Sequence, residues 1–328
     1  MTSPGDDRQS WRPQAGTDVL RVRARVYQAI RDFFKQRGVW EVDTPSLAAA
    51  SVTDPAIESF ATRYDGHGDV APERYLITSP EFHMKRLLAA GSGSIYQLCH
   101  VFRQAELGSQ HNPEFTMLEW YRVGMGYREL MKEVDQLVRG LVKQDLQETQ
   151  YLTYQEAFVR YLDIDPLTAQ TEDLYRCAQQ AGLTTVAGED RDLYLDFLMS
   201  YRVQPQLGIG RLTFIYEYPA SQCALARIAP HNPQVAERFE LFAQGRELAN
   251  GFQELTDAAE QKRRFEQDLQ MRARRETNLV TPDQYFLDAL SAGLPDCSGV
   301  ALGVDRLIQF MLDKKSVGDV LAFPFNRA

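Results

Sequence analysis

Two segments rich in β-branched and aromatic residues flank the loop that carries the most polar chemistry in the sequence. Residues 95–102 and 114–121 have the composition of strands, and the loop between them holds an arginine, a glycine, a histidine and an Asn-Pro pair. Side chains alternate between the two faces of a strand. Alternation therefore places four residues on one face of the second strand: Phe115, Met117, Glu119 and Tyr121.

Glu119 decides what this face can do. Burial of a charged carboxylate among apolar side chains is costly unless an opposite charge or hydrogen bonds offset it. The pattern therefore predicts a cationic ligand on this face. The alternative is an edge hairpin in which Glu119 meets solvent, because acidic residues are seldom fully buried.

A second pair of carboxylates lies on a predicted hairpin, the last two of three strands expected at 212–218, 238–243 and 246–254. A Gln-Gly turn joins these last two strands, so Phe242 should oppose Glu247. Glu240 then shares a face with Glu247. The two carboxylates would repel each other, and a divalent metal between them would remove the repulsion.

The residues after Glu247 come together only if their strand is irregular. In a regular strand Asn250 and Glu254 share one face, and Glu247 points to the other. We expect a bulge near Asn250 and Gly251, because glycine permits the required backbone conformation. Without a bulge, either Glu247 or the other two polar residues face away from the site.

Two predicted helices begin at residues that could meet polar ligands. A short strand runs into Ser79, Pro80 and Glu81, where serine can cap, proline fits the first turn and glutamate suits the positive helix end. Capping alone can explain Glu81. A small-residue strand at 297–304 is followed by Arg306 at the start of another helix. Either an anion binds near Arg306, or this arginine pairs with an acid at the surface.

The remaining elements form the expected scaffold. Apolar spacing predicts a helix at 18–38 with Asp18 as its N-cap, a short strand at 39–42 and a helix at 127–143. The charged helix predicted at 256–275 should present a solvated face. We expect three divisions of the chain: a flexible tail at 1–17, a folded unit at 18–328, and a helical insertion at 145–210 within that unit.

Composition limits the classes of function. The chain has 328 residues, is 44% hydrophobic and has a net charge of −9, which argues against extensive nucleic-acid binding. Four scattered cysteines favour a reducing compartment, and the five histidines form no zinc-ligand spacing with them. The sequence contains neither an apolar signal segment nor a membrane-spanning run. We therefore expect a cytoplasmic protein.

These segments together resemble the catalytic domain of class II aminoacyl-tRNA synthetases, and lysyl-tRNA synthetase in particular. The likeness runs from residue 19 to residue 328. Phe102 and Arg103 through HNPEFTMLEWY resemble motif 2, ALGVDRL resembles motif 3, and RELANGFQELTD resembles the lysine-enzyme segment between them. The helix, strand and Pro45 resemble motif 1. The resemblance implies an α+β fold with a mostly antiparallel sheet flanked by helices.

The resemblance assigns one group of residues to ATP and magnesium. Arg103 would hold the α-phosphate and the reacting carboxylate, and Arg306 would engage the γ-phosphate and one face of adenine. These two arginines are the catalytic candidates. Glu240 and Glu247 would bind Mg²⁺. Phe115 would stack on adenine. The other expected ATP contacts are Ala105, Glu106, His111, Asn112, Leu248 and Gly303.

A second group is assigned to the amino acid. Glu81 would take the amino group nearest the carboxylate, and Asn250 would lie near that carboxylate. The distal ammonium would be received by Glu119, Tyr121 and Glu254. The remaining residues expected to line this pocket are Ser79, Pro80 and Ala301.

Three departures from the synthetase pattern matter. The family's anticodon-binding domain has no counterpart before motif 1, so tRNA is not expected as acceptor. The motif 2 glutamate falls on Ala105, with Glu106 beside it. Ala301 stands where lysyl-tRNA synthetases place glycine, and its methyl group should narrow the amino-acid site and alter which lysine isomer fits.

Truncated paralogues of lysyl-tRNA synthetase share these departures and runs such as SPEFHMKRLL. They activate (R)-β-lysine with ATP and transfer it to a lysine side chain of elongation factor P, a protein shaped like tRNA. The resemblance implies that chemistry, a homodimer, and lysine or (R)-β-lysine as substrate. Two alternatives are an activator that makes another amide and a non-catalytic regulator that binds lysine or nucleotide. Arg103, Glu247 and Arg306 argue against the regulator, since binding alone needs no metal-and-phosphate site.

Overall fold

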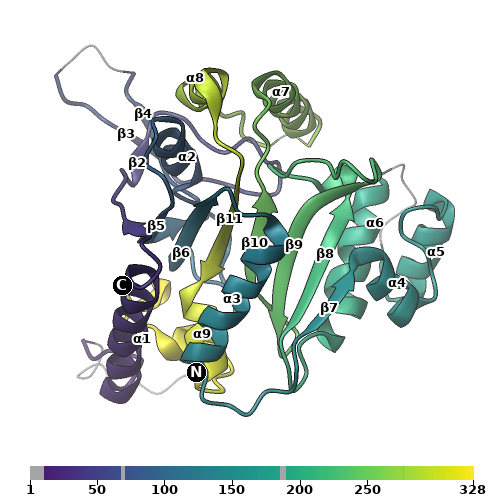
Figure 1. Cartoon of the computed structure of the whole chain (residues 1–328), viewed down its shortest axis with the longest axis horizontal. Helices are drawn as coiled ribbons and strands as arrows, with labels where there is room; N and C mark the ends of the chain where they lie inside the picture. Colours follow the sequence, from purple (N-terminus) through teal and green to yellow (C-terminus); the bar gives the residue numbers. More distant parts are fainter. Residues whose placement is uncertain (1–10, 68–70, 185–189, 276) are drawn as a thin grey trace, which may run out of the picture.

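A large, mainly antiparallel sheet forms the centre of the protein, whose computed structural model describes residues 11–67, 71–184, 190–275 and 277–328 (Figure 1). Only its two outer pairs, β1 with β5 and β7 with β8, run parallel. In spatial order the strands are β1 (Trp40–Glu41), β5 (Ile95–Phe102), β6 (Glu114–Val123), β11 (Cys297–Gly303), β10 (Arg246–Gln253), β9 (Val235–Ala243), β8 (Thr213–Pro219) and β7 (Gln150–Thr153).

Three helices cover one face of this sheet: α1 (Thr17–Lys35), α3 (Tyr127–Leu141) and α9 (Val304–Met311). Their apolar stripes pack on Leu118 and Trp120 of β6 and on neighbouring strand residues, which together make the main core. Glu119 and Tyr121 alternate with these two residues and therefore point to the other face of the sheet. The helices thus leave that second face available for a site.

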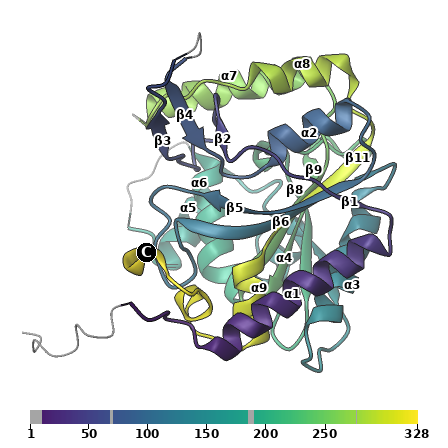
Figure 2. The same cartoon turned by 90° about the vertical axis from the view of Figure 1, so that its left-hand side faces the viewer.

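A second group of elements stands at one end of the uncovered face (Figure 2). A small sheet, in the order β2-β4-β3, lies beside three helices whose apolar residues pack on Ile95 and Tyr121. The strands are β2 (Leu47–Ala48), β3 (Ala61–Arg63) and β4 (Glu73–Leu76), and the helices are α2 (Glu81–Ala89), α7 (Ala258–Arg274) and α8 (Gln284–Gly293). They lie beside the part of the sheet that carries Tyr121.

The stretch expected as a helical insertion packs on the β7 and β8 end of the large sheet, on the face opposite α1, α3 and α9. It contains α4 (Tyr154–Leu162), α5 (Thr171–Gln180), α6 (Arg191–Leu198), a π-turn at Met199–Val203 and a 3-10 turn at Gln204–Gln206. These elements have a core of their own, built around Tyr154, Phe158, Leu174 and Leu198. The prediction missed β7, a short edge strand before α4. Residues 185–189 of the insertion lie outside the described residues.

Three expectations about the scaffold need correction. Helix α1 begins at Thr17 after Gly16, so Asp18 lies in the first turn and is not the N-cap. Residues 1–10 of the expected tail lie outside the described residues, but the backbone N–H groups of Gln14 and Ala15 donate to the carbonyls of residues 322 and 321 at 2.7 and 3.1 Å. Helix α7 is not simply solvated, because four of its residues are buried: Gln261, Arg264, Phe265 and Arg272.

Candidate active site

Four of the expected site residues form one row across the uncovered face of the sheet. Glu119 of β6 lies opposite Ala301 of β11, Ala301 lies opposite Asn250 of β10, and Asn250 lies opposite Glu240 of β9. Directly paired residues of neighbouring strands project to the same face. In the next row, Tyr121 faces Gly299. Strand pairing therefore brings these residues together from four separate parts of the chain.

The hairpin of β9 and β10 confirms the predicted pairing of Phe242 with Glu247 and the predicted irregularity, but the bulge lies elsewhere. The register shifts between Glu247 and Ala249, so Leu248 is the extra residue. This shift turns Glu247 to the face of Asn250. Gly251 has another role, because a Cβ there would come within 2.4 Å of the Phe239 ring. Glycine at that position permits close packing and not the bulge.

The acidic residues of the amino-acid end are deeply buried. The exposed fraction is 2% for Glu119 and 1% for Glu254. The Tyr121 hydroxyl donates a 2.6 Å hydrogen bond to Oε1 of Glu119. The alternative of an exposed edge hairpin is therefore wrong, and these carboxylates need compensation inside the protein.

Lys85 supplies the first part of that compensation, and the sequence analysis missed it. Its Nζ lies 2.6 Å from Oε1 of Glu81 and forms a second ion pair with Oε2 of Glu254. The lysine side chain is only 1% exposed. Glu81 and Lys85 are four residues apart on α2, a spacing that places them on one helix face and could have revealed the pair.

Burial controls the protonation of this cluster. It raises the pKa of Glu119 to about 8, helped by the charge of Glu81 and opposed by the Tyr121 hydrogen bond and by Lys85. Burial also raises the pKa of Glu254 to about 7, against the attraction of Lys85. Near neutral pH the free site therefore holds protons that a cationic ligand would displace.

The end expected to bind the nucleotide has a different character, because its two arginines are partly exposed. Arg103 follows β5, and its guanidinium carbon lies 5.2 Å from the centre of the Phe115 ring. Arg306 opens α9 and donates from Nη1 to the carbonyl of Glu247 at 3.1 Å and from Nε to that of Gln110 at 3.2 Å. The exposed fractions of the Arg103 and Arg306 side chains are 26% and 24%, so both can meet a ligand from solvent.

The motif 2 loop explains how the acidic position shifts by one residue. Ala105 has a φ of +65°, a left-handed conformation that is unfavourable for a residue with a Cβ. After this turn, Oε1 of Glu106 lies 3.6 Å from Nη1 of Arg103. The arrangement favours Glu106 as the substitute for the glutamate of the family pattern.

His111 and Asn112 occupy different surroundings in the same loop. His111 is exposed, and partial desolvation together with the charge of Arg306 lowers its pKa. Asn112 is buried, donates from Nδ2 to the carbonyl of Glu114 at 2.6 Å, and accepts at Oδ1 from the backbone N–H of Phe325 at 2.9 Å. Its amide already serves the local structure, so its nucleotide role stays a prediction without geometric support.

Each of the two carboxylates expected to bind metal pairs with an arginine. Arg238 pairs with Glu240 and donates from Nε to Oδ1 of Asn250 at 3.2 Å. Oε2 of Glu247 lies 3.5 Å from Nη1 of Arg306. Across the described ranges, no group of three or more histidine, cysteine, aspartate or glutamate residues could hold a metal ion. Mg²⁺ commonly uses one or two carboxylates and completes its ligands with phosphate oxygens, so this pair fits an ion that arrives with a nucleotide.

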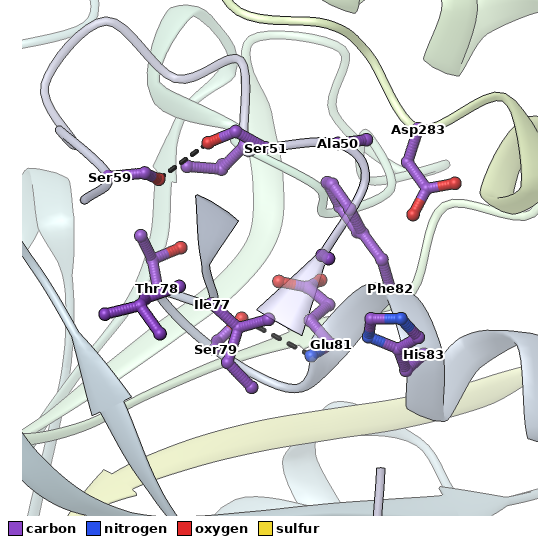
Figure 3. A pocket seen from close by; sticks show the side chains of 13 residues that line it. Ala50, Ser51, Ser59, Ile77, Thr78, Ser79, Glu81, Phe82, His83 and Asp283 are labelled. Carbon is purple, nitrogen blue, oxygen red and sulfur yellow. Dashed lines mark hydrogen bonds between the residues drawn. The ribbon is translucent and has the colours of Figure 1, made fainter. Parts of the chain in front are cut away.

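The remaining predicted residues lie on the edges of the site. Ser79 Oγ accepts the Glu81 backbone N–H at 3.4 Å, and Pro80 directly precedes α2. Figure 3 shows the carboxylate of Glu81 beside a cavity of about 30 Å³ lined by polar and apolar residues of β2, β4 and α2 and by Asp283. Gly303 joins β11 to α9 and leaves room beside Arg306.

A fully buried arginine of α7 holds a loop next to the site. Arg272 donates to the backbone carbonyls of Thr53, Asp54, Ile57 and Asn278 at 2.6–2.9 Å and pairs with the carboxylate of Glu58. The carbonyl of Glu58 in turn accepts the backbone N–H of Gln104, the neighbour of Arg103, at 2.8 Å. One arginine in a charged helix gave no signal in the sequence, since all of its partners except Asn278 lie more than 200 positions away.

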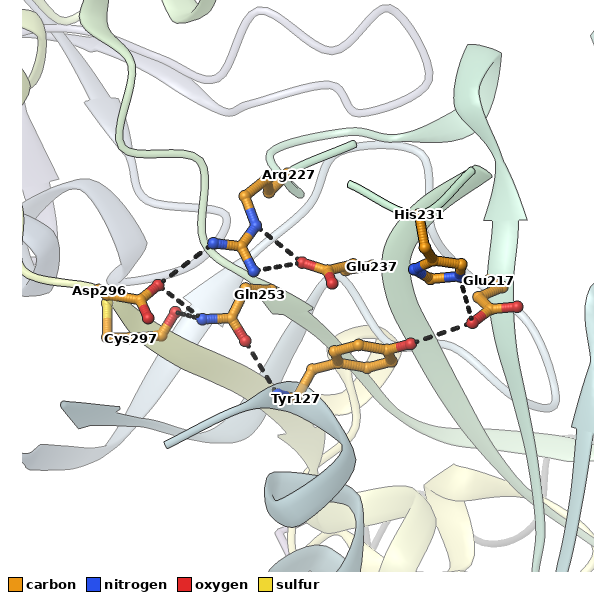
Figure 4. A network of polar contacts seen from close by, with 8 residues as sticks. All are labelled: Tyr127, Glu217, Arg227, His231, Glu237, Gln253, Asp296 and Cys297. Atoms are coloured by element: carbon orange, nitrogen blue, oxygen red, sulfur yellow. Dashed lines mark hydrogen bonds and ion pairs between the residues drawn. The ribbon is translucent and has the colours of Figure 1, made fainter. Parts of the chain in front are cut away.

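A polar network fixes the strand ends that carry Glu254 (Figure 4). Gln253 accepts the backbone N–H of Tyr127 at 2.9 Å and donates to Oδ1 of Asp296 at 2.9 Å and to the carbonyl of Cys297 at 3.1 Å. The same Cys297 carbonyl accepts the backbone N–H of Glu254 at 3.0 Å. These bonds join β10, β11 and the start of α3 directly beside the buried carboxylate.

Comparison with known proteins agrees with this geometry. The family described as tRNA synthetases class II (D, K and N) matches residues 9–327, so the chain belongs to that family. The proteins named elongation factor P–(R)-β-lysine ligase in Salmonella typhi and Salmonella schwarzengrund are each 51% identical to it over 322 residues, covering 97% of this chain and 98% of the relative. The predicted family, fold class and ligase activity are confirmed.

Within the described ranges, no helix is long and apolar enough to cross a bilayer.

Proposed function

We propose that this protein uses ATP to activate (R)-β-lysine, or lysine, as an aminoacyl adenylate and transfers the acyl group to a lysine side chain of elongation factor P. One observation carries most weight: Glu81, Glu119 and Glu254 surround a single ammonium, that of Lys85, at the end of the site away from Arg103 and Arg306. Such a pocket suits an amino acid with two amino groups. The names of the relatives support the same substrate and acceptor.

In the first step a carboxylate oxygen of the amino acid attacks the α-phosphorus of ATP, and the bond to pyrophosphate breaks. Arg103 would stabilise the negative charge that develops on the α-phosphate, a contribution of roughly 10²–10³ in rate for one positioned donor. Arg306 would hold the terminal phosphate. Glu240 and Glu247 would bind Mg²⁺, which when present neutralises phosphate charge.

In the second step a neutral lysine amine of the acceptor attacks the acyl carbon of the adenylate. An amide bond forms, the bond to the phosphate oxygen breaks, and AMP leaves. The amine loses a proton, which water or the departing phosphate can accept. The buried amino-acid end would hold the substrate still, while the more open nucleotide end admits the acceptor.

The test has two stages. ATP–pyrophosphate exchange is measured with lysine and with (R)-β-lysine, and we expect exchange that depends on at least one of them. Purified elongation factor P and lysine tRNA are then offered as acceptors and analysed by mass spectrometry, and we expect only the protein to gain the aminoacyl mass. Absence of exchange with both isomers would refute activation, and acylated tRNA with unmodified protein would refute the proposed acceptor.

We also propose that the enzyme acts as a homodimer in the cytoplasm, without tRNA as acceptor. The motif 1 resemblance supports the dimer, together with Trp40 on the edge strand β1, whose exposed fraction is 64%. Four free cysteines support a reducing compartment. Sedimentation across a concentration series tests the dimer, which a constant monomer mass would contradict.

A further inference from the structure

Lys85 is a buried cation inside a pocket that we propose to bind cations. It lies one helical turn after Glu81 on α2, and its second partner, Glu254, directly follows β10. Its Nζ also lies 5.7 Å from the centre of the Phe286 ring of α8. The ammonium thus joins three elements that meet only in the folded protein.

Lys85 contacts one oxygen of each of its two carboxylate partners. It uses Oε1 of Glu81 and Oε2 of Glu254. The neighbouring carboxylate of Glu119 differs, because its Oε2 is buried and lacks a hydrogen-bond partner among the residues that the structure describes. Unpartnered buried carboxylate oxygens are costly and indicate a missing donor.

Gly299 lets two side chains of the cluster pack directly on the backbone of β11. A Cβ at this glycine would come within 2.5 Å of Oε1 of Glu254 and 2.3 Å of the Tyr121 ring. Both side chains therefore reach across the backbone of β11, and any larger residue would push them away. Glycine keeps Glu254 and Tyr121 close to Glu119, on the face where the amino acid is proposed to bind.

The charges of the cluster define its complement. When Glu81, Glu119 and Glu254 are all ionised, the single ammonium of Lys85 leaves two negative charges. A ligand with two ammonium groups neutralises them. A ligand with one ammonium group leaves a buried negative charge. That charge either costs desolvation free energy or is removed by uptake of a proton.

We infer that Lys85 is a specificity-determining and positioning residue, whose fixed ammonium orients Glu81 and Glu254 and sets the charge of the pocket for a doubly cationic amino acid. This inference deepens the proposed function and rests on it for the identity of the amino acid. Its two ion pairs raise the pKa of Lys85 despite its burial, so the side chain stays protonated and does not act as a nucleophile.

The experiment uses cadaverine, which is lysine without its carboxylate, as a probe of binding that needs no catalysis. Titration calorimetry in buffers of different ionisation enthalpy gives both the affinity and the number of protons released. The variant Lys85→Met keeps most of the side-chain length and removes the charge. Lys132→Met, at an exposed position of α3, is the matched control.

Without the ammonium, the facing carboxylates should hold about one more proton, and that proton should stay when cadaverine binds, because two ammonium groups neutralise only two of the three carboxylates. The carboxylates that can share this proton are Glu81 on α2, Glu119 on β6 and Glu254 after β10, whereas the Tyr121 hydroxyl and the Cys297 thiol beside them are already protonated. We expect Lys85→Met to bind cadaverine about 100-fold more weakly, because Glu81 and Glu254 lose the cation that orients them, and to release about as many protons as the wild type. Lys132→Met should match the wild type in both quantities.

Chemical rescue separates charge from packing. In Lys85→Ala, added propylammonium should restore cadaverine affinity by at least about tenfold, whereas propanol should not. Cadaverine affinity within about threefold of the wild type in Lys85→Met, or no rescue of Lys85→Ala, would overturn the inference and leave Lys85 a packing residue. Failure of the wild type to bind cadaverine would overturn the inference and the proposed amino-acid site together. Normal cadaverine behaviour without ATP–pyrophosphate exchange would instead refute only the proposed reaction.

Discussion

The two ends of the site treat charge in opposite ways. At the amino-acid end, Glu119 and Glu254 are 2% and 1% exposed and depend on Lys85. At the nucleotide end, the side chains of Arg103, Arg306 and Glu247 are 26%, 24% and 37% exposed. Buried charges interact strongly and demand an accurate partner, whereas exposed charges are screened by water and salt. We therefore expect the buried end to select the amino acid and the exposed end to serve phosphate binding and chemistry.

The largest expected effect comes from removing Arg103, the arginine that we propose to face the α-phosphate. Arg103→Ala should lower the rate of adenylate formation about 10³-fold, because the developing phosphate charge loses its donor. Its effect on stability should be small, since the side chain is partly exposed. Single-turnover measurement of AMP formation tests the rate, and thermal unfolding tests the fold. Arg63→Ala, at an exposed surface pair, is the control. A collapse of the melting temperature in Arg103→Ala alone would contradict the division between the two ends.

A smaller loss is expected at the buried end. Glu254→Gln keeps the shape of the side chain but leaves Lys85 with one carboxylate fewer. We expect kcat/KM for the amino acid to fall about 100-fold and KM for ATP to change less than about threefold. Steady-state exchange kinetics with each substrate varied separately measure both values. Equal losses for amino acid and ATP would show that Glu254 supports the whole site and not one end.

The contrast between the two ends also separates what the sequence could predict from what it could not. Residue composition identified β5, β6 and β11, alternation assigned the faces of β6, and the short turn after β9 correctly paired Phe242 with Glu247. These features are local, because strand geometry and turn length determine them. The sequence therefore predicted which residues share a face with Glu119, but it left open whether that face is buried.

Compensation of the buried charges was not predictable in the same way. Lys85, Arg238 and Arg272 were all missed, although the carboxylate of one partner is near in sequence for Lys85 (Glu81) and for Arg238 (Glu240). Their other partners lie on separate elements, such as Glu254 for Lys85 and the backbone carbonyl of Thr53 for Arg272. The repulsion between Glu240 and Glu247 was noted, and in the protein each of these carboxylates pairs with an arginine. The bulge was predicted at Gly251, which is the wrong position, because a glycine that permits close packing looks the same in sequence as one that permits a turn.

The buried end should also make stability depend on pH. Glu119 has a pKa of about 8 in the folded protein, compared with 4.5 for an ordinary glutamate. Between these values the folded state holds a proton that the unfolded chain has lost, so its stabilising effect is complete below pH 4.5 and disappears as pH rises through 8. The free energy of unfolding should fall by about 2 kcal/mol between about pH 6 and 8 because of this group.

Denaturant titrations across this range, with wild type and Glu119→Gln, measure that dependence. The variant cannot ionise at this position and should show a shallower decline. Saturating cadaverine should also flatten the wild-type curve, because a cationic ligand favours the ionised carboxylate. Parallel curves for wild type and variant would show that Glu119 titrates normally and that the buried end is more open than the structure indicates.

The smallest effect is expected between the two ends, at Ala301. This residue lies in the row between Glu119 and Asn250, so its methyl group projects where the ammonium-binding and carboxylate-binding sides of the amino-acid pocket meet. Ala301→Gly should widen that point and shift the ratio of kcat/KM towards α-lysine over (R)-β-lysine by about fourfold, the worth of one methyl contact. Competition between the two isomers in one reaction, resolved by mass spectrometry of the product, measures the ratio directly. An unchanged ratio would mean that the isomers are distinguished by the placement of their amino groups near Glu81, with the methyl group of Ala301 as a bystander.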